Sequence, residues 1–118
     1  MNLKSRECVI VGGGQVALRK ARLLASANAQ LVVIAPDICK ELKNLKQVHT
    51  THQREFRDAD IDNATLLIVA TNDTKLNEYI SRLAHLNNLP VNVVDNPSLC
   101  SFITPSIVDR SPIVVAIS

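Results

Sequence analysis

Apolar residues are concentrated in short runs that are separated by longer segments of mixed polarity. The runs cover residues 9–11, 30–35, 65–71 and 90–94, and a more polar one covers residues 47–52. Runs of this length that are rich in Val, Ile and Leu are typical of strands buried on both faces of a sheet. We therefore predict an α/β domain with a parallel sheet of about five strands.

Two segments between these runs, 15–27 and 75–87, have the apolar spacing of helices. The residues expected to line their buried sides are Val16, Leu23, Leu24 and Ala27 in the first and Leu76, Tyr79, Ile80, Leu83 and Leu86 in the second. Asn28 is placed to end the first helix, because Asn tolerates the left-handed conformation that often follows a helix. The polar turn 72–74 is expected to cap the start of the second helix.

The first strand runs directly into the glycine turn Gly12-Gly13-Gly14, and a helix follows. The pattern Gly12-x-Gly14-x-x-Ala17 fits the dinucleotide fingerprint. In that fingerprint the first glycine makes the turn, the second lets the backbone approach a pyrophosphate, and the third small residue packs the helix on the sheet. Phosphates would lie at the helix N-terminus, where unpaired N–H groups attract anions. This context favours a nucleotide-binding turn over a structural one and predicts a Rossmann-like, doubly wound sheet.

The end of the second strand bears on the choice of nucleotide. The strand ends in Ala35-Pro36, and the first acidic residue is Asp37. Asp37 either binds the ribose hydroxyls of NAD or caps a helix over residues 38–45, and the sequence leaves both open. No Arg follows to hold a 2′-phosphate, which favours NAD over NADP. Ligands bind beyond the carboxyl ends of such strands, where Thr71 and Asp95 also fall.

The chain changes character after Asp95. Two β-rich stretches, 101–108 and 113–118, flank Asp109-Arg110-Ser111-Pro112, and we predict an antiparallel C-terminal β-hairpin. Its last strand would leave an open apolar edge, so it is expected to meet either another subunit or a part of the chain that is missing here. We accordingly divide the chain into a nucleotide-binding domain, 1–100, and the hairpin, 101–118. The segment Asp95-Asn96-Pro97 taken alone is typical of an Asx turn.

Composition narrows the class further. The 118 residues are enough for one domain, and with 47% apolar but only 3% aromatic residues the core must be aliphatic. A net charge of +2 and scattered basic residues do not predict nucleic-acid binding, and the cluster Arg19-Lys20-x-Arg22 is interpreted as a solvated helix face. No apolar run approaches the roughly 20 residues of a membrane span, and the N-terminus lacks the apolar part of a signal peptide.

Neither cysteines nor histidines predict a resident metal. Cys8, Cys39 and Cys100 are far apart and form no C-x-x-C pair, so they are expected to be reduced thiols of a cytoplasmic protein. His49 and His52 are three residues apart on an expected strand, which would point them to opposite faces. We predict no metal site there.

These motifs together resemble the precorrin-2 dehydrogenase/sirohydrochlorin ferrochelatase family, the N-terminal NAD-binding part of sirohaem synthase. The segments that carry the resemblance are Val11–Ala21, Val33–Pro36, Ala70–Asp73, Val91–Asp95 and, most specifically, Ser101–Ser118. It implies NAD contacts at Gln15, Val16, Pro36 and Asp37, and a catalytic aspartate at Asp95 that serves both reactions. It also implies precorrin-2 and sirohydrochlorin as tetrapyrrole substrates, ferrous iron as a substrate, and a homodimer whose dimerisation region begins at 101–118 and is truncated here.

Alternatives from other classes are a non-enzymatic NAD-sensing regulatory domain and another NAD-dependent oxidoreductase. Sensing domains typically end the second strand with an acid, and Ala35-Pro36 counts against that. Short-chain oxidoreductases carry a Tyr-x-x-x-Lys pair, whereas Tyr79 is followed four residues later by Leu83. A substrate with many carboxylates needs cationic partners, for which Arg54, Arg57 and Arg110 are candidates that are otherwise solvated surface charges.

Overall fold

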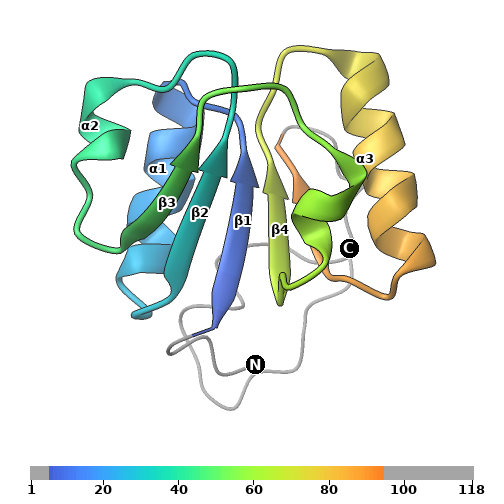
Figure 1. Cartoon of the computed structure of the whole chain (residues 1–118), viewed down its shortest axis with the longest axis horizontal. Coiled ribbons are helices and arrows are strands. Elements are labelled where there is room, and N and C mark those ends of the chain that lie inside the picture. Colours follow the sequence, from blue (N-terminus) through green and yellow to red (C-terminus); the bar gives the residue numbers. More distant parts are fainter. Residues whose placement is uncertain (1–5, 95–118) are drawn as a thin grey trace.

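The computed structural model of the chain describes residues 6–94, which form one sheet with helical segments on both faces (Figure 1). Its strands are β1 (Glu7–Val11), β2 (Gln30–Ile34), β3 (Val48–His52), β4 (Leu66–Val69) and β5 (Val91–Val93). Its helical segments are α1 (Gln15–Ala25), α2 (Lys40–Lys43), the 3₁₀ turn η1 (Asp58–Ile61) and α3 (Thr74–Leu86).

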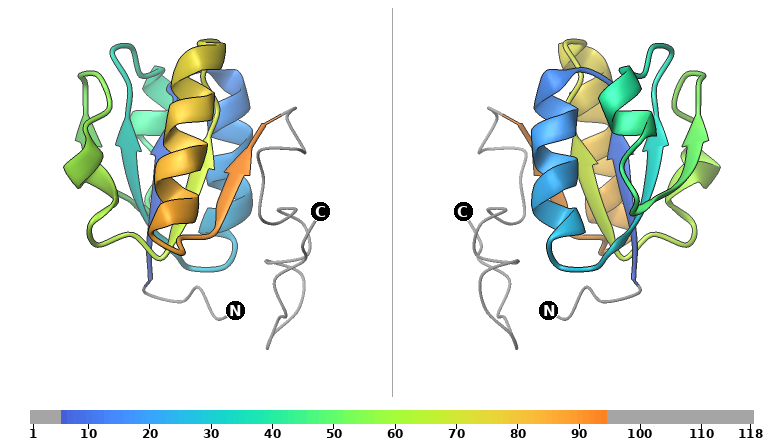
Figure 2. Two further views of the ribbon diagram at one scale, coloured as in Figure 1. Left: turned by 90° about the vertical axis from the view of Figure 1, so that its right-hand side faces the viewer. Right: turned by 90° about the vertical axis from the view of Figure 1, so that its left-hand side faces the viewer.

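The sheet is wholly parallel and has the strand order β3-β2-β1-β4-β5. The chain proceeds outward from β1 to β3 and then returns to the other side of β1 to add β4 and β5. Helices α1 and α2 cover one face, and η1 and α3 cover the other (Figure 2). The predicted Rossmann-like fold with five strands is therefore confirmed, and its topological switch point lies between β1 and β4.

The core is aliphatic, as the composition predicted, but α1 buries a different stripe from the one expected. The residues of α1 that are buried against the sheet are Ala17, Leu18, Ala21, Leu24 and Ala25. Val16 and Leu23, which were expected to face the core, are only half-buried. Alanine gives little apolar signal in a sequence, yet its small side chain lets the helix approach the sheet closely.

Helix α3 also buries a face that differs from the predicted one. Ile80 is buried as predicted, but Tyr79 is 42% and Leu86 77% exposed. The hydroxyl of Tyr79 donates a hydrogen bond to Asp58 in η1 at 2.6 Å, so its ring lies along the surface. Polar Asn77 and Ser81 take part in the buried face instead. Apolar spacing alone misplaced this face because two of the buried residues are polar.

The predicted helix ends are largely confirmed. Asn28 and Asn88 have positive φ values of 60° and 54°, as expected of residues that end α1 and α3. Asp73 caps α3, and its Oδ1 accepts a hydrogen bond from the Leu76 N–H at 3.1 Å. Asp37 does not cap a helix: α2 is short and begins after Cys39, without a side-chain capping bond. The alternative prediction that Asp37 caps a helix was therefore wrong.

Several expectations concern residues outside the described part of the chain. They are the catalytic role of Asp95, the reduced thiol of Cys100, the cation Arg110 and the hairpin 101–118. Within residues 6–94, no helix combines the length and apolarity that crossing a bilayer requires.

Candidate dinucleotide site

The first glycine of the turn must be glycine for two reasons. Gly12 follows β1 with a φ of +139°, which L side chains rarely adopt. A Cβ at this position would lie 2.5 Å from the carbonyl oxygen of Ala70, which follows β4. The Gly12 N–H donates to the Ile34 carbonyl at 2.9 Å. Gly12 therefore holds the ends of β1, β2 and β4 close together.

Gly13 has a structural role that the sequence did not assign to it. A Cβ here would lie 1.9 Å from the carbonyl oxygen of Asp37. The Gly13 carbonyl also accepts a hydrogen bond from the Cys39 N–H at 2.8 Å. The middle glycine thus packs the turn directly on the loop that follows β2. The run of three glycines was the sequence signal for this role, because the dinucleotide fingerprint accepts any residue at the middle position.

Gly14 differs from both neighbours because nothing lies within 4 Å of the position its Cβ would take. It is exposed and precedes the first turn of α1, whose start has no side-chain capping bond and no acidic residue. The first N–H groups of a helix lack partners within the helix and carry partial positive charge. The open space at Gly14 and the start of α1 together form a site suited to a phosphate group.

A cleft of about 650 Å³ opens at this point, along the carboxyl ends of β1, β2 and β4. All the sequence-predicted cofactor residues that precede Asp95 line it, namely Gly12, Gly14, Gln15, Val16, Pro36, Asp37 and Thr71. The structure therefore brings together residues that lie far apart in the chain, from Gly12 to Thr71. Its size is in the range of small-molecule and cofactor sites.

Two residues after β3 also line the cleft, and neither was predicted from the sequence. Glu55 is exposed and Phe56 is half-buried. Glu55 adds a carboxylate to that of Asp37, and Phe56 adds an aromatic ring. No motif marked them, because their place in the cleft depends on how the β3–η1 loop folds back toward β2.

Thr71 lines the cleft, but its side chain is already engaged within the protein. Its hydroxyl donates to the Oδ1 of Asn77 and accepts from the Asp73 N–H at 3.1 Å. The Asn77 side-chain amide donates in return to the Thr71 carbonyl at 3.1 Å. These bonds fix the turn between β4 and α3 at the edge of the cleft. Asn77 is a positioning residue that its polar character hid from the apolar pattern.

Arg54, one of the expected cationic partners for a substrate, is engaged in an ion pair. Its guanidinium donates to both carboxylate oxygens of Asp60, at 2.7 and 2.9 Å. The Arg57 N–H donates to the same carboxylate at 2.7 Å. The hydrogen bond from Arg54 lowers the pKa of Asp60. Arg54 therefore anchors the β3–η1 loop, and its interpretation as a solvated surface charge was wrong.

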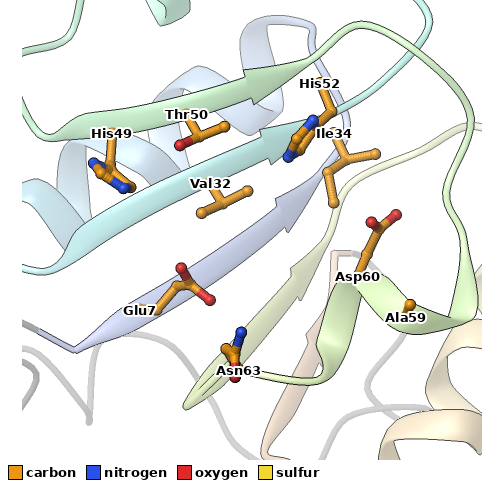
Figure 3. Close-up of a pocket in the computed structure, with 9 residues that line it drawn as sticks. All are labelled: Glu7, Val32, Ile34, His49, Thr50, His52, Ala59, Asp60 and Asn63. Atoms are coloured by element: carbon orange, nitrogen blue, oxygen red, sulfur yellow. The ribbon is translucent and has the colours of Figure 1, made fainter.

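The two histidines of β3 lie on the same face, contrary to the prediction. Leu31 of β2 pairs with Val48, but Val32 pairs with Thr50, so His49 is an extra residue that forms a β-bulge. His49 and His52 consequently line one small pocket together with Glu7 and Asp60 (Figure 3). Among the described residues, no three ligating side chains are close enough to share a metal ion.

The comparisons with known proteins agree with the geometry of the cleft. Residues 1–106 match the family model described as "Putative NAD(P)-binding". Over its full length the chain is 52% identical to siroheme synthase of Thioalkalivibrio sulfidiphilus and 50% identical to siroheme synthase of Nitrosomonas europaea. It spans 24% and 26% of these two proteins, so it corresponds to about a quarter of their length.

A solved structure supports the same assignment. The chain superposes on SirC, precorrin-2 dehydrogenase, with a TM-score of 0.70 and 27% sequence identity. The match covers 80% of this chain and 47% of that one.

Proposed function

We propose that the chain, which belongs to this NAD(P)-binding family, is the dehydrogenase part of a siroheme synthase. In this role it oxidises precorrin-2 to sirohydrochlorin with NAD as the hydride acceptor, and the same site then inserts ferrous iron. The observation that carries the proposal is the cleft at the switch point. It occurs in a chain that is 52% identical over its length to part of a siroheme synthase and similar in fold to a precorrin-2 dehydrogenase. The proposed location is the cytoplasm.

The residues of the cleft fit a dinucleotide. The turn at Gly14 leaves room for a pyrophosphate at the start of α1. Asp37 and Glu55 supply carboxylates that can accept hydrogen bonds from ribose hydroxyls. Gln15 and Val16 complete the first turn of α1 beside the phosphate position. When bound, NAD supplies a nicotinamide ring that accepts a hydride.

The charge of the cleft favours NAD over NADP. Its described lining includes three carboxylates, those of Asp37, Glu55 and Asp73, and no lysine or arginine. A 2′-phosphate on the adenine ribose would meet carboxylates near the end of β2 without a cation to compensate. The pyrophosphate, which both cofactors share, meets the N-terminus of α1 instead.

Asp95 is the proposed catalytic group, and its neighbours in sequence support this. The N–H of the preceding residue, Val94, donates to the Val69 carbonyl at 2.9 Å, so β5 still accompanies β4 at its carboxyl end. The residues that follow Val69, Ala70 and Thr71, line the cleft. Asp95 would take the proton that the tetrapyrrole loses as its hydride leaves. It would later accept pyrrole N–H protons as ferrous iron enters.

The test is Asp95→Asn in the complete protein, with precorrin-2 oxidation and iron insertion measured separately. Asparagine keeps the hydrogen bonds of an Asx turn but cannot accept a proton. We expect both activities to fall by about 10²–10⁴-fold, the usual contribution of a general base, with unchanged affinity for NAD. Normal turnover in both assays would show that Asp95 only forms a turn. Loss of one activity alone would show that the two reactions use different groups.

The segment 101–118 is proposed to form a β-hairpin that begins a dimerisation region. The support is its sequence pattern of two β-rich stretches around Asp109-Arg110-Ser111-Pro112, whose last strand would carry an open apolar edge. Sedimentation of the complete protein at several concentrations tests this. A monomer at every concentration would contradict the dimer.

A further inference from the structure

Helix α1 has a second face that is not buried against the sheet. Val16, Arg19, Lys20 and Leu23 recur at intervals of three and four residues and therefore share one side of the helix. Together with Val94 and Arg22 they line a groove of about 550 Å³. From the sequence alone, this cluster of cations was expected to be a solvated helix face. The structure places it beside apolar side chains along one wall of a groove.

The groove adjoins the dinucleotide cleft. Val16 lines both of them, so the two spaces meet at the first turn of α1. At the end of β5, Val94 contributes to the groove and directly precedes Asp95 in the chain. A molecule held in the groove would thus lie next to the bound cofactor and beside Val94, the residue that precedes the proposed base.

The charge of the groove is opposite to that of the cleft. Its described lining contains three cations and no carboxylate, whereas the lining of the cleft contains three carboxylates and no cation. The ion pair of the described region joins Arg54 to Asp60, and Arg19, Lys20 and Arg22 form none with any residue in 6–94. Lys20 is half-buried, which strengthens its attraction for an anion relative to a fully solvated lysine.

We propose that this groove binds the tetrapyrrole substrate, with Arg19, Lys20 and Arg22 pairing with its carboxylates and Val16, Leu23 and Val94 contacting an edge of its ring system. The inference rests on the proposed function. A tetrapyrrole with acidic side chains has an apolar ring system and a rim of carboxylates, which is the combination that the groove complements. The carboxylates would also keep the substrate out of the acidic cleft, so that substrate and cofactor bind side by side.

The experiment uses the complete protein and the double variant Arg19→Gln/Lys20→Gln. The matched control is Lys46→Gln/Arg82→Gln, which removes two exposed cations that line neither the groove nor the cleft. Steady-state oxidation gives KM values for precorrin-2 and for NAD. Fluorescence titration gives the affinity for uroporphyrin and for coproporphyrin, which carries fewer carboxylates on the same ring.

We expect the double variant to raise the KM for precorrin-2 and the Kd for uroporphyrin by about tenfold, as the loss of two partly exposed charge pairs would. The Kd for coproporphyrin should rise less. The KM for NAD and kcat should stay within about twofold of the unsubstituted protein, because the lost contacts are equal in ground and transition states. The charge-retaining variant Arg19→Lys/Lys20→Arg should recover most of the affinity, and the control should resemble the unsubstituted protein.

Two failures can be told apart. If the unsubstituted protein oxidises precorrin-2 and the double variant matches it in KM and in uroporphyrin affinity, the groove does not bind the substrate and the inference is overturned. An equal loss in the control variant overturns it as well, because net charge would then be the cause. If the unsubstituted protein does not oxidise precorrin-2 at all, the proposed function fails, and the inference fails with it.

Discussion

Substitutions in the glycine turn should separate folding from cofactor binding. In Gly12→Ala the new Cβ lies 2.5 Å from the Ala70 carbonyl oxygen at a φ of +139°. The unfavourable φ costs about 1–3 kcal/mol and the overpacking a similar amount, so we expect a loss of about 2–5 kcal/mol. In Gly13→Ala the Cβ lies 1.9 Å from the Asp37 carbonyl oxygen, and the two loops must separate at a cost of about 3 kcal/mol.

Gly14→Val should have the opposite profile. The position has an ordinary φ of −95° and nothing within 4 Å of its Cβ, so the stability of the fold should change by no more than about 1 kcal/mol. The valine side chain would, however, occupy the space through which the pyrophosphate approaches the start of α1. We expect Gly14→Val to abolish NAD binding and to keep a cooperative thermal transition.

The assays are urea and thermal denaturation followed by circular dichroism, and calorimetric titration with NAD. A loss of 2–5 kcal/mol corresponds to a fall in Tm of roughly 10–20 °C for a domain of this size. The reasoning would be refuted if Gly14→Val lost as much stability as Gly13→Ala, or if Gly13→Ala matched the unsubstituted protein. NAD binding by Gly14→Val with normal affinity would refute the assignment of the phosphate site.

Three further predictions follow from the charges and burial. Calorimetry should show tighter binding of NAD than of NADP, and equal or tighter binding of NADP would contradict the role given to the acidic lining. Because its native pKa is lowered, Asp60 contributes stability at neutral pH that is lost as the pH falls below about 4. Urea titrations should therefore show that Asp60→Asn has a lower free energy of unfolding than Asp62→Asn at pH 7. The free energy of unfolding of Asp60→Asn should also fall less when the pH is lowered. Burial raises the pKa of Cys8 to about 12, so mass spectrometry should find Cys8 alkylated only after unfolding and half-buried Cys39 earlier.

The sequence predicted the strands, their parallel order and the glycine turn, because each depends on local pattern. Strands buried on both faces leave unbroken apolar runs in the sequence. The residue that ends a helix in the left-handed conformation is commonly Gly or Asn, as at Asn28. The sequence predicted less well which side of each helix is buried. In α3 the polar Asn77 is buried because Thr71, in the turn that precedes the helix, offers it hydrogen-bond partners.

The remaining misses depend on how strands pair and how the β3–η1 loop folds. The bulge at His49 arises where β3 pairs with β2, and nothing near His49 in the sequence marks it. Arg54 looks like any surface cation until the loop brings Asp60 to it. Glu55 enters the cleft by the same loop. Local patterns thus predicted residues that line the cleft, while the charge and shape of the cleft walls required the tertiary structure.

The way α1 packs explains how one helix can serve two neighbouring sites. Ala17 and Ala21 are fully buried, and larger side chains there would overpack the interface and move the helix away from the sheet. Close packing fixes the start of α1 beside the glycine turn, where the phosphate site is proposed. It also fixes the adjacent stripe, so that Val16 stands between cleft and groove. The third small residue of the fingerprint, Ala17, therefore sets the position of the proposed phosphate site and, through the same helix, the position of the cations proposed to hold the substrate.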